Sequence, residues 1–384
     1  MKKIVVWLTV LITVMSVIVP VKAEGPEIEA PCAILTEAST GRVIYEKNAD
    51  ESLHPASITK IMTLLIIFDA VDDGSISPED TVTVSEHAAS MGGSQVFLEP
   101  GEKQTVETMI KCIAIASAND ACVAMAEHIS GSEDAFVQSM NERAEALGMN
   151  NTHFVNCCGL DADGHMTTAR DVAIMSRELI TAHPAIHDYS CIWMDTITHV
   201  TRRGESEFVL NNTNKLLKQY EWATGLKTGS TSLAKFCLSA TARRNDIELI
   251  SVIMASPSGK TRVSDSIALL NYGYGICSLY HDNNMPSIDV VPIKGGIRSD
   301  ISVEYSSQMN YLFTDKYDAS LIERHAEYLE DLEAPVQKGD VIGQLTYTYD
   351  GKFMDSIDII ASESIKKAGY GDYINSLWQC FLGN

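Results

Sequence analysis

Three short motifs carry side chains that could transfer an acyl group through a serine: Ser57-Ile58-Thr59-Lys60, Ser117-Ala118-Asn119 and Lys227-Thr228-Gly229. A serine hydroxyl is a weak nucleophile until a base accepts its proton. A lysine three residues later on a helix lies on the same face as the serine. Ser57 and Lys60 therefore fit a nucleophile and its base, although Ser57 taken alone could be an ordinary helix N-cap.

Lys60 can act as a base only when its amine is neutral, and burial and a nearby positive charge both favour the neutral form. Lys227 could supply that charge. Lys227 and Thr228 also offer donors for a carboxylate, and Gly225 and Gly229 would let this strand edge approach a ligand. The alternative for Lys227 is a solvated strand lysine.

Ser117 and Asn119 lie in a break between two helical patterns. There Ser117 could relay a proton and Asn119 could bind a peptide bond, although both could simply cap a helix. A helix that begins near Ser57 would place backbone N–H groups and the positive end of its dipole where an oxyanion develops.

The elements that hold these motifs follow from the spacing of apolar residues. Two apolar strands around a turn at 39–41 predict a hairpin. Residues three and four apart predict a helix from Ser57 and helical structure from Val106 to about Leu147, with breaks at Ser117 and Gly131. Strand character returns over 198–254, so we expect a sheet with helices from the middle of the chain.

A loop-like run from Asp282 to Pro286 predicts a domain boundary. We expect a first domain over 24–284 and a small β-rich domain over 285–367, in which short strands alternate with glycine turns. The last segment, 368–384, has one apolar helical face, which we expect to dock peripherally on the outer face of the cell membrane, with docking on the protein as the alternative. That face consists of Ile374, Leu377, Trp378, Phe381 and Leu382.

Residues 1–23 have the pattern of a secretory signal, with Lys2 and Lys3, an apolar run over 4–19 and a small-residue site at Ala23. An uncleaved anchor is the alternative, but the run is short for the ~20 residues that a membrane span needs. We expect an exported, extracytoplasmic protein. The formal net charge of −22 argues against nucleic acid as a partner.

The chain has nine cysteines, an odd number without a repeating spacing. A disulfide scaffold has an even, dense set in a shorter chain. We therefore expect mostly free, buried thiols, with one pair left open, in a cell that exports into a reducing or anaerobic setting. No CxxC or HExxH motif occurs, so we expect no metal and no cofactor.

The motifs in this order resemble those of the penicillin-binding serine acyl-transferases, and most closely the low-molecular-mass D-alanyl-D-alanine carboxypeptidases. The resemblance runs from about Ala30 to the C-terminus. Further short matches include Gly93-Ser94, Asn119-Asp120-Ala121, Gly159-Leu160, His165, Thr168-Ala169-Arg170-Asp171 and 334–340.

This resemblance implies an α+β fold, in which a β-lactamase/transpeptidase-like domain, with an antiparallel sheet and a helical subdomain, precedes a small β-rich domain. It implies Ser57 as the acylated nucleophile, Lys60 as the base and Ser117 as the proton shuttle. The implied substrate contacts are the Asn119 amide, Lys227 and Thr228 toward a terminal carboxylate, Gly229, the backbone N–H groups of Ser57 and Ser230, and, on a weaker local match, Arg262.

The implied substrate is a peptidoglycan stem peptide that ends in D-Ala-D-Ala, and β-lactams would acylate the same serine. The terminal helix is similar to the family's membrane anchor. Two departures stand out, because Ala118 replaces a usual glycine and Cys157-Cys158 replaces an Asn-Pro-like pair before Gly159. We expect the second departure to alter the local loop.

Other functions remain open at this point. A class A β-lactamase needs a glutamate to activate the deacylating water, and 159–177 contains no Glu-x-x-Leu-Asn. An esterase of the same fold would hydrolyse simple esters without releasing D-alanine. A non-catalytic β-lactam sensor or wall-binding module would not need Lys60, Ser117 and Lys227 together.

Overall fold

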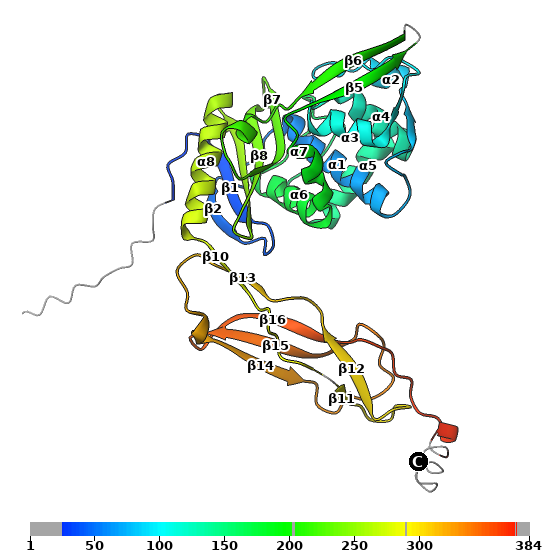
Figure 1. Ribbon diagram of the computed structural model, residues 1–384, viewed down its shortest axis with the longest axis vertical. Helices are drawn as coiled ribbons and strands as arrows, with labels where there is room; N and C mark the ends of the chain where they lie inside the picture. The colour runs from blue at the N-terminus through cyan, green and yellow to red at the C-terminus, as the bar shows by residue number, and fades with distance from the viewer. Residues whose placement is uncertain (1–24, 202–203, 289, 373, 375–384) are drawn as a thin grey trace, which may run out of the picture.

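The computed structural model describes residues 25–374 except 202, 203, 289 and 373. Figure 1 shows two bodies, a larger one of helices around a sheet and a β-rich one formed by the chain after α8 (Gly259–Ile276). The predicted signal segment and all of the predicted terminal apolar face except Ile374 lie outside the described residues.

A five-stranded antiparallel sheet organises the larger body, with the order β2-β1-β9-β8-β7. Its central strands are apolar on both faces: Ile34 packs into the helical core, whereas Leu35 packs beneath α8 (Gly259–Ile276). Strand β7, which carries Lys227, lies at one edge. The strands are β1 (Cys32–Glu37), β2 (Val43–Lys47), β7 (Ala223–Thr231), β8 (Lys235–Arg244) and β9 (Ile247–Ser256).

The helical side of this body is built around α1 (Lys60–Asp72), which is buried along most of its length. Side-chain caps begin several of its neighbours, with Ser132 accepting from Ala135 N and Thr168 from Asp171 N. The surrounding elements are η1 (Ala56–Thr59), α2 (Glu86–Ala89), α3 (Val106–Ala114), α4 (Asn119–Ser130), α5 (Glu133–Ala146), α6 (Ala169–Ala182), α7 (His187–Ser190), and the strand pairs β3 (Thr81–Thr83) with β4 (Lys103–Thr105) and β5 (Met194–Thr201) with β6 (Gly204–Asn211).

The predicted hairpin, the helix after Ser57, and the breaks at Ser117 and Gly131 are confirmed. Helices α6 and α8 were not predicted. The buried face of α6 has residues three and four apart, Val172, Met175 and Leu179, so its signal was present in the sequence. By contrast, the buried face of α8 includes Asp265, Ser266 and Gly273 among its apolar residues, so the helix lacks a continuous apolar stripe.

The β-rich body is a second five-stranded sheet, with the order β11-β12-β16-β15-β14. Edge strand β14 was not predicted, because none of its seven residues is buried and Arg324 interrupts the alternation of its apolar residues Ile322, Ala326 and Tyr328. Strands β10 and β13 pair at the junction with the larger body. The bounds are β10 (Ser278–His281), β11 (Val290–Pro292), β12 (Asp300–Tyr305), β13 (Asn310–Phe313), β14 (Ile322–Tyr328), β15 (Val341–Tyr349) and β16 (Lys352–Ala361).

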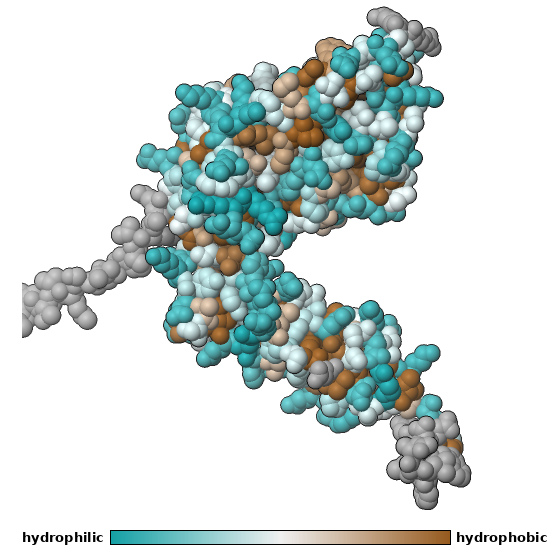
Figure 2. All heavy atoms as spheres, in the orientation of Figure 1, coloured by the Kyte–Doolittle hydropathy of each residue, from teal (hydrophilic) through white to brown (hydrophobic). Residues whose placement is uncertain are grey.

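The two bodies touch where the turn before β2 meets β13. The Arg42 guanidinium donates to the Leu312 carbonyl and lies 5.7 Å from the centre of the Tyr311 ring. Figure 2 shows polar residues over most of the visible face of both bodies, with apolar residues in small groups. Within the described residues, we find no helix with the length and apolarity required to cross a membrane.

Candidate active site

Ser57 lies in the short helix η1, immediately before α1. Neither η1 nor α1 has a side-chain cap, so Ser57 is not the N-cap that the sequence left as an alternative. Its Oγ accepts a hydrogen bond from Lys60 Nζ at 3.1 Å. The expected nucleophile and base are therefore in contact at the start of one helix.

Lys60 is fully buried, and its Nζ has three oxygen partners. Besides Ser57 Oγ, it donates to Asn119 Oδ1 and to the Cys158 carbonyl, both at 2.6 Å. An ammonium group has three N–H donors, so these acceptors match its capacity. They fix the amine against the serine.

Ser117 lies in the turn between α3 and α4 with a φ of 61°, a strained conformation for a residue other than glycine. Lys227 Nζ donates to Ser117 Oγ at 2.9 Å and to the Thr228 carbonyl at 3.1 Å. Burial, and then the charge of Lys60, hold the pKa of Lys227 well below its usual range. The second and third motifs therefore meet beside the first.

Asn119 is the first residue of α4, and both ends of its amide have partners. Its Oδ1 accepts from Lys60, and its Nδ2 donates to the Gly92 carbonyl at 2.7 Å. Its backbone N–H donates to the Ser94 carbonyl at 2.7 Å. A loop around Gly92 that the sequence did not predict therefore orients this amide.

Strand β7 packs closely against the turn that carries Ser57. A Cβ atom at Gly229 would lie 2.9 Å from the Pro55 carbonyl oxygen and 3.0 Å from Ser57 N, so a side chain there would push the strand away. Thr228 Oγ1 lies 2.7 Å from Thr213 Oγ1, and Ser230 is exposed. The glycine thus brings the strand edge to the serine.

Arg262, on α8, lies behind the same strand. Its Nη1 donates to the Gly229 and Cys237 carbonyls, each at 3.0 Å. Its Nε is buried and lacks a hydrogen-bond partner within the described part of the chain. Burial lowers the pKa of this guanidinium. The structure thus places Arg262 next to the third motif, where the weaker match put it.

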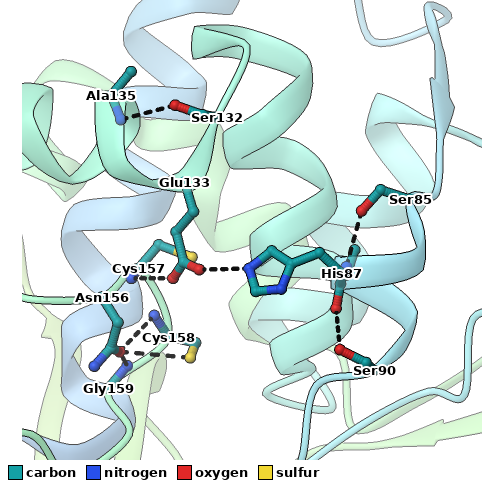
Figure 3. Close-up of polar contacts among 11 residues, drawn as sticks. Ser85, His87, Ser90, Ser132, Glu133, Ala135, Asn156, Cys157, Cys158 and Gly159 are labelled. Atoms are coloured by element: carbon teal, nitrogen blue, oxygen red, sulfur yellow. Dashed lines mark hydrogen bonds and ion pairs between the residues drawn. The ribbon is translucent and has the colours of Figure 1, made fainter.

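A loop on the other side of Lys60 was missed because its contribution is a backbone carbonyl. Asn156 Oδ1 accepts from the N–H groups of Cys158, Gly159 and Leu160, at 3.2, 2.7 and 3.1 Å. Figure 3 shows the bonds to Cys158 and Gly159. These bonds shape the turn that presents the Cys158 carbonyl to Lys60. The sequence signals for this region were the Gly159-Leu160 match and the Cys157-Cys158 departure.

Gly159 packs that loop against the turn that carries Ser57, η1 (Ala56–Thr59). It has a φ of +85°, and a Cβ atom there would lie 1.9 Å from the Ala56 carbonyl oxygen. No side chain can fit at that separation.

His165 also contacts the turn that carries Ser57, through Thr59. Its Nδ1 accepts from Val155 N at 2.9 Å, and its Nε2 lies 2.8 Å from Thr59 Oγ1, which itself donates to the Ala56 carbonyl. Burial, and then the charges of His54 and His153, lower the pKa of His165 to about 4.

The described cysteines are all free, and of these only Cys191 is exposed. Cys380 lies outside the described residues. Across residues 25–374, apart from the gaps already given, no three His, Cys, Asp or Glu side chains are grouped so that they could hold a metal ion.

Comparison with known proteins matches both bodies. Residues 19–258 match the family described as D-alanyl-D-alanine carboxypeptidase, and residues 280–367 match the C-terminal domain of penicillin-binding protein 5. The chain is 41% identical over 345 residues to D-alanyl-D-alanine carboxypeptidase DacF of Bacillus subtilis, which covers 89% of this chain and 87% of that protein. It is 33% identical over 392 residues to D-alanyl-D-alanine carboxypeptidase DacA of Escherichia coli, an alignment that covers 93% of this chain and 90% of that protein.

The solved structures agree. Penicillin-binding protein 5 from Haemophilus influenzae is similar with a TM-score of 0.76 at 29% identity, over 90% of this chain and 99% of that chain. The expected α+β architecture with a β-rich second domain is confirmed. The chain belongs to the D-alanyl-D-alanine carboxypeptidase family of low-molecular-mass penicillin-binding proteins, which are serine enzymes.

Proposed function

We propose that Ser57 is the residue through which this carboxypeptidase removes the terminal D-alanine of peptidoglycan pentapeptides. The observation that carries the proposal is the pairing of two buried lysines with two serines around one point. Lys60 Nζ lies 3.1 Å from Ser57 Oγ, and Lys227 Nζ lies 2.9 Å from Ser117 Oγ. This arrangement supplies a nucleophile, a base and a route for the proton.

In the first step, Ser57 Oγ attacks the carbonyl carbon of the penultimate D-alanine while Lys60 accepts the serine proton. The backbone N–H groups of Ser57 and Ser230 stabilise the oxyanion, where one such donor is typically worth ~2.7–4 kcal/mol. Ser117 relays the proton to the leaving amine, and D-alanine departs. Water then hydrolyses the ester on Ser57.

The substrate is held by its polar ends. Lys227 and Thr228 face its terminal carboxylate, and Arg262 adds positive potential from behind Gly229. Asn119 binds a substrate amide, which requires it to exchange one of its present partners. A β-lactam imitates the D-Ala-D-Ala end and acylates Ser57 in the same way.

The test is mass spectrometry of the purified protein, first with a peptide that ends in D-Ala-D-Ala and then with penicillin. We expect release of D-alanine, and a penicilloyl mass on the peptide that contains Ser57. S57A should lose both, whereas the exposed-site control S52A should keep both. D-alanine release by S57A would refute the assignment, and an adduct with ester hydrolysis but no D-alanine would favour an esterase.

We further propose that residues 1–23 direct export, that the catalytic domain covers 24–284 and the β-rich domain 285–367, and that 368–384 bind peripherally to the outer face of the cell membrane. The end of α8 at Ile276 and the family match from residue 280 support a boundary close to Asp282. Cell fractionation tests the membrane contact, because a chain that stops at residue 367 should leave the membrane fraction while keeping penicillin binding.

A further inference from the structure

We infer that Cys157 and Cys158 form a peroxide-responsive thiol pair whose oxidation to a disulfide between the adjacent residues releases Lys60 and inactivates the enzyme. The inference rests on the proposed role of Lys60 as the base. It starts from a feature that the reaction does not use, two neighbouring free thiols in the wall of the active site.

The peptide bond between the two cysteines is anchored to the catalytic helix. The Cys157 carbonyl accepts from Thr63 Oγ1 at 2.5 Å, and the Cys158 N–H donates to Asn156 Oδ1 at 3.2 Å. The next carbonyl, that of Cys158, accepts from Lys60 Nζ at 2.6 Å. Any rotation of this peptide therefore disturbs the position of Lys60.

The outer side of the loop is equally tied (Figure 3). The Cys157 N–H donates to Glu133 Oε1 at 3.1 Å, and Glu133 Oε2 lies 3.0 Å from His87 Nε2. Cys158 Sγ lies 3.5 Å from Asn156 Oδ1, the same oxygen that shapes the turn. The reduced thiols are therefore part of the hydrogen-bonded loop.

The two thiols differ in reactivity. The neighbouring Cys157 thiol, and then the charge of Lys60, lower the pKa of Cys158 to about 7 against the effect of burial. The neighbouring Cys158 thiol, and then burial, raise the pKa of Cys157 well above its usual value. Cys158 is thus the more nucleophilic sulfur and Cys157 the resolving thiol, which is the division of roles in a redox-sensing pair.

The chemistry balances with one hydrogen peroxide. The Cys158 thiolate attacks a peroxide oxygen, the O–O bond breaks, and with one proton taken up a water leaves and Cys158 carries a sulfenic acid. The sulfur of Cys157 then attacks Cys158 Sγ, forms the S–S bond and releases a second water. Two thiols lose two electrons, and peroxide is reduced to two waters.

Peroxide is small enough for this site. Cys157 is 0% and Cys158 1% exposed, which disfavours bulky disulfide reagents. Leu160, two residues later, is 37% exposed, so the loop that carries the thiols reaches the surface.

Ring closure must move the backbone. Adjacent Cα atoms lie about 3.8 Å apart across a trans peptide, whereas disulfides usually join Cα atoms about 4.4–6.8 Å apart. The disulfide would be strained and readily reduced. Its formation would turn the 157–158 peptide away from Thr63 and Asn156 and withdraw the Cys158 carbonyl from Lys60.

The test treats the reduced, full-length enzyme with hydrogen peroxide. Unreduced peptide mapping should show a loss of about 2 Da, two hydrogen atoms, in the peptide that contains residues 157–158. The rate of Ser57 acylation by a fluorescent penicillin should fall about tenfold to a hundredfold, because small misplacements of a reacting group have effects of that size. Dithiothreitol should restore the rate.

Three variants locate the effect, each compared with its own reduced form. C157A should not show the 2 Da loss, because oxidation of its Cys158 stops at the sulfenic acid, which adds an oxygen atom instead. C122A, which removes a neighbouring buried thiol, and C191A, which removes the exposed one, should respond as the wild type does.

Absence of the 2 Da loss, a disulfide that leaves the acylation rate unchanged, or a bond from Cys122 would each overturn the inference. Failure of the reduced enzyme to acylate Ser57 would instead refute the proposed function, since mapping reports the disulfide independently of activity.

Discussion

Two buried lysines dominate the site at the scale of single residues. Lys60 is 0% and Lys227 2% exposed, and neither forms an ion pair in the described structure. Removing an ammonium from water is costly unless its donors are satisfied. Lys60 is satisfied by three oxygens, whereas Lys227 has a serine hydroxyl and its neighbour's carbonyl. Lys227 should therefore lower the free energy of unfolding of the protein, and its proposed role in substrate binding would explain its presence.

Replacing Lys227 should separate stability from activity. K227M should raise the free energy of unfolding at pH 7 by about 0.5–2 kcal/mol and abolish penicillin acylation. Because the folded pKa of Lys227 is lowered, the unfolded chain binds more protons between that pKa and ~10.4, so this residue makes wild-type stability rise with pH there.

The measurement is urea unfolding of both proteins at several pH values, read as a difference so that other titrating groups cancel. A difference that does not shrink as the pH rises toward ~10.4 would contradict the assignment.

His165, which contacts the turn that carries Ser57, should make the stability of the fold sensitive to acid. Its pKa is about 4 when folded and ~6.5 when unfolded, so the unfolded chain binds the extra proton between these values. Stability is therefore lost as the pH falls from ~6.5 to ~4, by roughly 3 kcal/mol. Melting temperatures over this range should fall less in H165Q than in the wild type. The exposed-site control H128Q should behave as the wild type does.

At the scale of elements, the loop around Gly159 packs directly against the turn that carries Ser57. Gly159 and Gly74 both have φ near +80°, but a Cβ atom overlaps Ala56 only at Gly159, and nothing lies within 4 Å at Gly74. An alanine in this conformation costs about 1–2 kcal/mol at either position. G159A should lose a further ~1–3 kcal/mol through overlap and should slow acylation. Denaturant unfolding and penicillin labelling of G159A and G74A test this, and equal losses would disprove the packing argument.

The sequence predicted the reactive groups better than their surroundings. Ser57 and Lys60 could be paired because they are one helical turn apart, and the β7 residues because glycines flank them. Helix α8 and strand β14 could not be found in that way, since neither has a one-sided apolar pattern. The Cys158 carbonyl was also unpredictable, because a backbone oxygen has no residue type and its position depends on Asn156.

At the scale of the whole molecule, Arg42 links the two bodies through Leu312 and Tyr311. R42A should leave the acylation rate within about twofold, because the described hydrogen bonds of Arg42 are with Thr40 and Leu312 and none is with a residue of the three motifs. Small-angle scattering should show a broader distribution of interdomain distances, and chymotrypsin should cleave near Tyr280 faster. R298A, which removes a surface ion pair with Glu363, is the control. Unchanged scattering in R42A would exclude this link.

Burial of the cationic side chains also determines how far the enzyme's attraction for anions extends. The chain has a formal charge of −22, so other polyanions meet a repulsive exterior. Lys60 and Lys227 are enclosed, and electrolyte screens exposed charges beyond about 8–10 Å. A carboxylate is therefore attracted only when it lies close to these two lysines. Such a protein can pass through an anionic polymer mesh without adhering to it, while still retaining the one peptide end that reaches the proposed nucleophile, Ser57.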